Sequence, residues 1–103
     1  MKNSIRVRTE QNEGITEVKM LIRHPMETGL RKDSKTGDPI PPHFITEVLC
    51  TLNGAKVFTA FWGIAVSKNP FLSFTLPDTK SGDTLAISWE DNTGDSDSVT
   101  ATI

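Results

Sequence analysis

The sequence has one cysteine, no tyrosine and no apolar run of the length that crosses a membrane. A single cysteine excludes an internal disulfide framework and a metal cage built from several thiolates. The 11 basic and 13 acidic residues give a net charge of -2, and the basic residues are spread along the chain. The charge balance therefore provides no basis for binding nucleic acid or an anionic membrane surface.

The length of 103 residues is sufficient for one domain with its own core. The first residues lack the apolar segment of a signal peptide, which favours a cytoplasmic protein. A mature periplasmic protein, or one exported together with a partner, would have the same sequence features. We expect a single domain over residues 1–103. The lack of an apolar N-terminal segment leaves both a cytoplasmic and a periplasmic location open.

Apolar and polar side chains alternate through most of the chain, which is the pattern of half-buried strands. No segment has the apolar spacing of a long helix. Seven or eight short strands predict an all-β fold, an immunoglobulin-like antiparallel β-sandwich. The expected strands cover residues 5–8, 15–23, 44–52, 55–62, 63–66, 71–76, 85–90 and 99–103.

The alternation also predicts which side chains face the core. Cys50 is on the inward face of its strand, where a free cysteine packs as a small apolar residue rather than acting as a nucleophile. The full inward set is Val18, Met20, Ile22, Phe44, Thr46, Val48, Cys50, Leu52, Leu72, Phe74, Leu76, Leu85, Ile87 and Trp89.

Asn53-Gly54 predicts a tight hairpin turn, because both residues tolerate the positive φ of a type I′ turn. The strand that follows is apolar on both faces, which predicts that it lies inside a sheet or against a partner. Its two faces carry Phe58, Ala60 and Trp62 on one side and Val57, Thr59 and Phe61 on the other.

A crossover at about residues 24–42 interrupts the alternation of apolar and polar side chains. A connection of this length inside a compact domain more often has a function than not. His24 and His43 flank it and could meet in space, where Glu27 or Asp33 would complete a three-ligand metal site. The spacing matches no metal motif, so structural or surface histidines are favoured. We predict no metal and no cofactor.

The acidic segment 90–97 resembles a calcium loop in composition only. Counting from Asp91, the twelfth position holds Thr102 where an EF-hand needs a carboxylate. A solvated hairpin turn is therefore expected. The sequence also contains no phosphate loop, nucleophile elbow or zinc motif. A binding module fits these features better than an enzyme does, since aromatic residues and methionine are enriched at protein interfaces.

Several blocks of the sequence resemble the SoxZ family and occur in the order of that family over nearly the whole chain. The segments HPMETG at 24–29 and SKNP at 67–70 are specific when taken together, while a short pair such as Asn53-Gly54 is weak. The blocks are HPMETGLR at 24–31, IPPHFI at 40–45, NG at 53–54, VSKNPFL at 66–72, GD at 82–83 and WEDNTG at 89–94.

The resemblance implies an immunoglobulin-like sandwich that pairs with a SoxY-like subunit as a heterodimer or higher oligomer. SoxY carries sulfur intermediates on a cysteine in a flexible tail, and the other Sox enzymes act on them during thiosulfate oxidation. SoxZ is not itself the carrier and is not an enzyme. The family is periplasmic, and SoxZ is exported together with a SoxY that bears the signal peptide.

Two groups of site residues follow from the interface reasoning together with the resemblance. The first group, expected to contact the partner, is Met26, Phe58, Phe61 and Trp62. The second group, expected to face the tail or a visiting enzyme, is His24, Glu27, Arg31, Lys68 and Asn69, where a Lys or Arg would stabilise an anionic thiosulfonate.

Two alternatives stay open on the sequence. One is a generic immunoglobulin-like interaction module of another extracytoplasmic assembly. The other is an enzyme that uses His24 and His43 with a metal ion.

Overall fold

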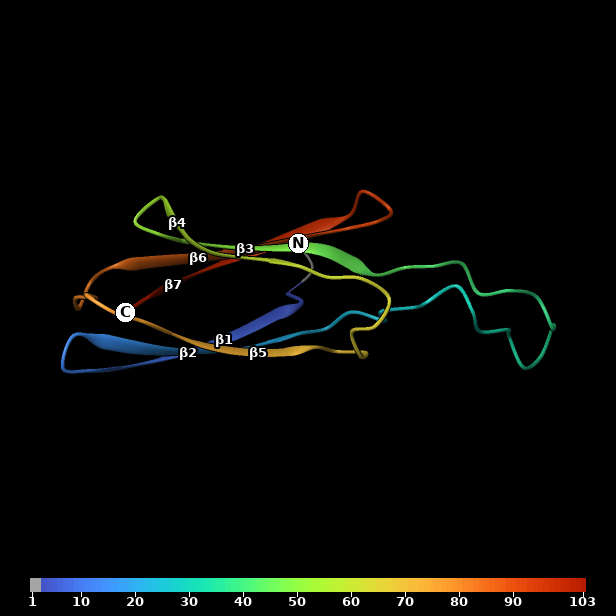
Figure 1. Cartoon of the computed structure of the whole chain (residues 1–103), viewed down its shortest axis with the longest axis horizontal. Coiled ribbons are helices and arrows are strands. Elements are labelled where there is room, and N and C mark those ends of the chain that lie inside the picture. The colour runs from blue at the N-terminus through green and yellow to red at the C-terminus, as the bar shows by residue number, and fades with distance from the viewer. Residues whose placement is uncertain (1–2) are drawn as a thin grey trace.

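A computed structural model describes residues 3–103 of this protein, and seven strands make up the regular structure of these residues (Figure 1). No helix long and apolar enough to span a membrane occurs among these residues. The strands are β1 (Ile5–Asn12), β2 (Ile15–Ile22), β3 (Ile45–Leu52), β4 (Ala55–Phe61), β5 (Phe71–Leu76), β6 (Thr84–Asp91) and β7 (Ser96–Thr102).

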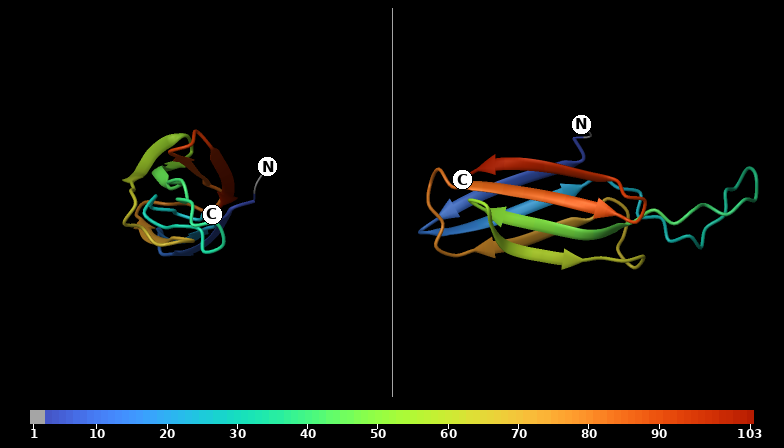
Figure 2. Two further views of the ribbon diagram at one scale, coloured as in Figure 1. Left: turned by 90° about the vertical axis from the view of Figure 1, so that its right-hand side faces the viewer. Right: turned by 90° about the horizontal axis from the view of Figure 1, so that it is seen from above.

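The strands form two antiparallel sheets that lie one above the other (Figures 1 and 2). One sheet has the order β1-β2-β5 and the other the order β4-β3-β6-β7. Every paired neighbour is antiparallel. The expected all-β, immunoglobulin-like sandwich is confirmed.

The core lies between the two sheets and contains the predicted inward faces of β2 and β6. Each of these strands buries alternate residues, because successive side chains of a strand point to opposite faces. The buried apolar residues are Ile5, Val18, Met20, Ile22, Met26, Ile45, Val48, Cys50, Leu76, Leu85, Ile87 and Trp89.

The start of β3 departs from the predicted alternation. Phe44 and Thr46 were expected to face inward, but Ile45 is fully buried and its two neighbours are only partly so. The pairing of β3 with β6 shifts register between Ile45 and Glu47. The extra residue of such a bulge inverts the alternation, which lets Ile45 and Val48 both reach the core.

The β3–β4 hairpin confirms the predicted turn, with φ of 51° at Asn53 and 86° at Gly54. The next strand was expected inside a sheet or against a partner. It does not lie inside a sheet, since β4 is an edge strand, and its contact with a partner stays a prediction. Residues 63–66 do not continue it as predicted. They form a turn in which the Val66 amide donates to the Gly63 carbonyl at 3.3 Å.

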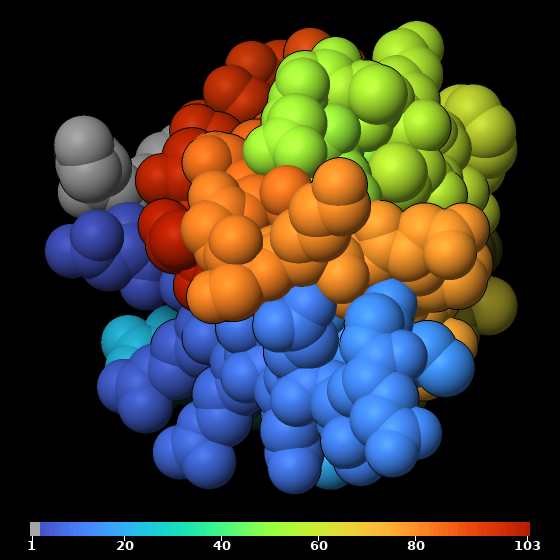
Figure 3. Space-filling model, turned by 90° about the vertical axis from the view of Figure 1, so that its left-hand side faces the viewer, coloured from blue at the N-terminus to red at the C-terminus, as the bar shows by residue number. Residues whose placement is uncertain are grey.

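The crossover is an extended arm, which we define as residues 24–43, that projects beyond one end of the sandwich (Figure 2). Its two sides run antiparallel and pair at Glu27 with His43 and at Lys32 with Pro39. The molecule consequently measures 54 × 21 × 21 Å. Figure 3 views the opposite end, where the turns after β1, β3 and β5 lie side by side.

Candidate functional site

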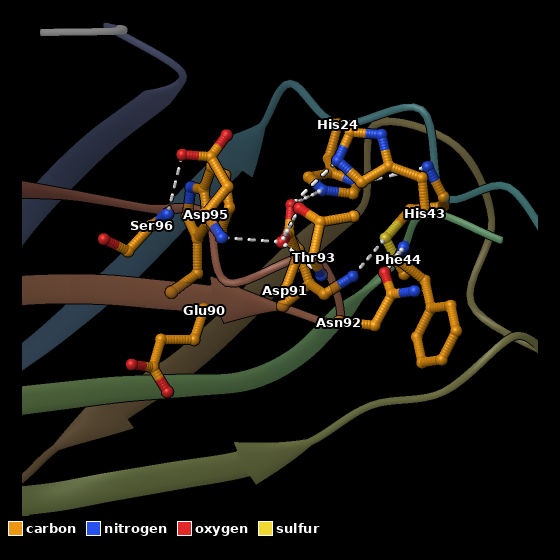
Figure 4. Close-up of polar contacts among 12 residues, drawn as sticks. His24, His43, Phe44, Glu90, Asp91, Asn92, Thr93, Asp95 and Ser96 are labelled. Atoms are coloured by element: carbon orange, nitrogen blue, oxygen red, sulfur yellow. Dashed lines mark hydrogen bonds and ion pairs between the residues drawn. The ribbon is translucent and has the colours of Figure 1, made fainter. Parts of the chain in front are cut away.

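A junction of two histidines and one aspartate holds the base of the arm to the sandwich (Figure 4). His24 Nε2 and His43 Nε2 lie 3.0 Å and 2.8 Å from the same atom, Asp91 Oδ2. The two imidazole rings meet edge to face with centroids 4.5 Å apart. His24 comes from the first side of the arm, His43 from the second and Asp91 from the end of β6, so the junction joins three distant segments.

The second carboxylate oxygen of Asp91 organises the β6–β7 turn. Oδ1 accepts hydrogen bonds from the backbone N–H of Thr93 at 2.9 Å, from the Thr93 hydroxyl at 2.6 Å and from the backbone N–H of Asp95 at 3.0 Å. The Asp91 side chain is 0% exposed. A buried carboxylate is costly unless its hydrogen-bonding capacity is met, and here both oxygens are fully occupied.

The pKa of Asp91 reflects two opposing effects. Burial by itself would raise it, but hydrogen bonds from His24, Thr93 and His43 stabilise the charged form and lower the pKa to about 2. The carboxylate therefore stays ionised throughout the neutral range and acts as the acceptor for all five donors.

Asp91 had been expected in a solvated hairpin turn, and this interpretation is wrong for that residue. The turn exists, but its first carboxylate points inward to the arm. No local pattern separates a buried from an exposed aspartate in such a turn. The partner histidines are 67 and 48 residues away, and only the folding of the arm brings them to Asp91.

The predicted meeting of the two histidines is confirmed, but their carboxylate partner is neither Glu27 nor Asp33. His24, His43 and Asp91 have ligand atoms within 4.8 Å of one another, as a metal site would require. However, His24 Nδ1 accepts a hydrogen bond from the Met26 N–H at 3.1 Å.

A neutral histidine with an acceptor Nδ1 carries its proton on Nε2. His24 Nε2 is the atom that faces Asp91, so it donates there and has no lone pair to offer to a metal ion. Metal-ligating histidines show the reverse arrangement, in which the second ring nitrogen donates to an outer acceptor. The geometry therefore favours a hydrogen-bonded junction, and the predicted absence of a metal stays a prediction.

Met26 lies in the core and not on the surface that was expected to meet a partner. The residue is 5% exposed, and its sulfur accepts a hydrogen bond from the Ile45 N–H at 3.3 Å. Its backbone has φ of 48°, a left-handed conformation that costs a residue with a side chain about 1–3 kcal/mol. The bond to His24 and the core packing hold Met26 there, so it presents little surface to a partner.

The residues expected to face a tail or an enzyme differ in their exposure and in their contacts. His24 is buried, whereas Glu27 and Arg31 form an ion pair of 3.1 Å on the arm with Arg31 largely exposed. Asn69 is exposed but fixed, since its side-chain oxygen accepts from the His24 N–H at 3.1 Å and its own N–H donates to the His24 carbonyl at 3.0 Å. Lys68 beside it is exposed.

The aromatic residues predicted for the partner contact lie on and beside β4. Phe58 faces inward and stacks on Phe74 of β5 with centroids 4.6 Å apart, which fills the gap between the two edge strands. Trp62 is partly buried. Phe61 points outward and is 79% exposed, and Val57 on the same face is 39% exposed. Phe61 is thus the residue of this group with the most surface to offer.

Cys50 is in the core, as its position on the strand predicted, and burial raises the pKa of its thiol to about 11. We expect Cys50 to resist a maleimide reagent at pH 8 while the chain is folded. The same thiol should label quantitatively once the chain is unfolded in denaturant. A thiolate is needed for this reaction, and the side chain must also be accessible. Mass spectrometry after timed labelling measures the labelled fraction of the folded and of the unfolded chain. Rapid labelling of the folded chain would contradict this placement.

Comparison with known families identifies one match. A family model described as "Sulphur oxidation protein SoxZ" matches residues 5–102, which includes all seven strands, the arm and the His24–Asp91–His43 junction. No curated protein matches the chain.

Proposed function

The chain belongs to the SoxZ family of sulfur oxidation proteins, and from this we propose that it is the non-catalytic partner subunit of a sulfur-carrier complex. The family implies a role in sulfur oxidation. In the proposed complex the chain binds a SoxY-like subunit, whose tail cysteine carries the sulfur, and presents it to the other Sox enzymes during thiosulfate oxidation.

The observation that carries this proposal is the exposed outer face of the β4-β3-β6-β7 sheet. Phe61 and Val57 are exposed on its β4 edge, and Leu49 is partly buried in the middle of β3. Small or hydroxyl side chains occupy the middle of this face, namely Thr51, Thr59, Ala86, Ser88, Ser98 and Thr100, while Glu47 and Glu90 lie opposite each other at one end of it. Small side chains allow another sheet to approach closely, and an exposed aromatic residue is a typical anchor of an interface.

The edge of β4 supports the same proposal. An unpaired edge strand tends to associate with other chains unless it is covered, charged or twisted away. Only Lys56 among the residues of β4 carries a charge. A partner that covers this edge would prevent unwanted association with other chains. It would also enclose Phe58 and Trp62, which are partly buried beside the edge.

The arm supplies the second part of the proposal, a contact to the tail or to a visiting enzyme. Arg31 and Lys68 are exposed at different places on and near the arm, and each can form charge-assisted hydrogen bonds with an anionic sulfur group. The junction at Asp91 fixes the base of the arm, so these cations would be held at a defined place relative to the sandwich. We also propose a periplasmic location, reached by export with the partner.

The test is association with a SoxY-like protein that ends in a glycine-flanked cysteine. Size exclusion with light scattering should give the mass of a stable complex at micromolar concentration. The matched control is the same partner without its tail, which should still bind if the sheet face carries the contact. Two folded chains that stay separate would contradict the proposal and favour a generic interaction module.

A further inference from the structure

The outer face of the β1-β2-β5 sheet carries a second set of exposed side chains. This sheet forms the side of the sandwich opposite to the β4-β3-β6-β7 sheet (Figure 1). The strand registers place them in rows across the sheet. Arg6 lies opposite Leu21, which lies opposite Phe71, and Arg8 lies opposite Lys19 in the next row. All five residues are exposed.

The charges on this face are separated by sign. Arg6, Arg8 and Lys19 occupy one end, while Glu10 and Glu17 form the following row. Lys19 pairs with Glu17 at 3.2 Å. Among the residues that the structure describes, neither Arg6 nor Arg8 takes part in an ion pair. Two guanidinium groups are therefore available to an outside acceptor.

Apolar surface lies directly beside these cations. Phe71 is 63% exposed and Leu21 is 36% exposed. A shallow groove of about 430 Å³ is lined by Arg6, Arg8, Lys19, Met20, Leu21 and Phe71. A groove of this size that combines apolar side chains with a few polar groups has the usual composition of a binding site. It is also basic, although the whole chain has a net charge of -2.

We propose that this groove binds an acidic segment of another protein that carries apolar side chains next to its carboxylates. Arg6 and Arg8 are two residues apart on one strand face, a separation of about 6.8 Å, which matches carboxylates two residues apart on an extended segment. Each guanidinium presents a planar fork of donors to a carboxylate. Leu21 and Phe71 take the apolar side chains of the same segment.

Charge complementarity also determines how the segment lies. Its carboxylates are attracted to the end with Arg6 and Arg8, and Glu10 and Glu17 repel them from the other end. The surface is separate from the sheet face proposed for the SoxY-like subunit, because the two outer faces point in opposite directions. The chain could therefore hold its partner and an acidic segment at the same time.

The test uses a synthetic peptide in which two Glu residues two positions apart are followed by two Leu residues two positions apart, with Ser between them. One face of the extended peptide then carries carboxylates about 6.8 Å apart with apolar side chains next to them. The full chain is labelled with ¹⁵N and titrated, alone and in its complex. We expect amide shifts at Arg6, Arg8, Lys19, Leu21 and Phe71. The dissociation constant of the peptide should rise about fivefold when added salt screens the attraction between its carboxylates and the cations of the groove. Peptides with Gln for Glu, or Ser for Leu, should bind more weakly.

The matched variants are R6S/R8S in the groove and K35S on the arm. Both sets replace exposed cations, so neither should change the urea midpoint noticeably. The double variant should bind the peptide about tenfold or more weakly, and Lys35→Ser should bind as the native chain does. Weakening in Lys35→Ser by the share expected for one of the two charges removed in R6S/R8S would mean that net charge alone attracts the peptide, which would overturn the proposal.

Two further results would also overturn it. One is the absence of shifts in the groove at a peptide concentration of about 1 mM, or shifts confined to β4. The other is tighter binding to vesicles of mixed anionic and neutral lipids than to the peptide, since the groove would then be a membrane-surface site. Because the titration of the chain alone needs no SoxY-like protein, its failure and the failure of the proposed function are separate results.

Discussion

Replacing Asp91 by Asn should lower the free energy of unfolding by about 3–5 kcal/mol, because it removes the charge from a fully hydrogen-bonded buried group. The amide would still offer one oxygen to the turn. Its NH₂ group, however, would face the N–H groups of His24 and His43, which now converge on Asp91 Oδ2. Urea denaturation followed by tryptophan fluorescence measures the loss.

The matched control is Glu90→Gln at the neighbouring position. Glu90 is exposed and its side chain points outward, so the same change of charge should alter stability by no more than about 0.5 kcal/mol. The arm should also loosen in Asp91→Asn, which hydrogen exchange at Glu27 and His43 would detect through their paired backbone groups. If the two variants have equal stability, the junction is not what holds the arm.

The same junction predicts the response of the protein to acid. The folded pKa of Asp91, about 2, is below its ordinary value of 3.8. A carboxyl group of this kind contributes stability above the unfolded pKa and loses it as the pH falls through the folded one. We expect about 2 kcal/mol to be lost between pH 4 and pH 2, and Asp91→Asn to lack this component. A native pH profile equal to that of Asp91→Asn would exclude this assignment.

Replacing Phe61 by Ser should weaken association with the SoxY-like partner about 30-fold or more, since exposed aromatic anchors contribute 2 kcal/mol or more at interfaces. Phe61 is 79% exposed in the free chain and fills no part of its core. The stability of the free chain should therefore change little. Isothermal titration with the partner measures the affinity, and urea denaturation of the free chain measures the stability.

The control for this prediction is Phe71→Ser. Phe71 is also a highly exposed phenylalanine, but it lies on the outer face of the other sheet. The variant Phe71→Ser should leave partner binding unchanged and should weaken binding of the acidic peptide instead. Lys68→Ala should likewise leave pairing unchanged. A loss of pairing in Phe71→Ser or Lys68→Ala, with Phe61→Ser unaffected, would move the partner to a different surface.

Local patterns in the sequence determined the sandwich. Period-two alternation gave the inward faces of β2 and β6, and Asn53-Gly54 gave the β3–β4 turn, because strand geometry and turn dihedrals depend on neighbouring residues. The buried position of Cys50 followed from the same alternation. The sequence blocks also identified the family.

Only the tertiary structure decided the features that depend on distant contacts. Alternation cannot show a bulge, so Ile45 was assigned to the wrong face, and it cannot tell an edge strand from an inner one, as β4 demonstrates. Met26 was expected to contact a partner because methionine is enriched at protein interfaces, yet the fold turns it into the core. Asp91 joins His24 and His43 across 67 and 48 residues of chain, and such a junction exists only once the arm has folded back onto the β6–β7 turn.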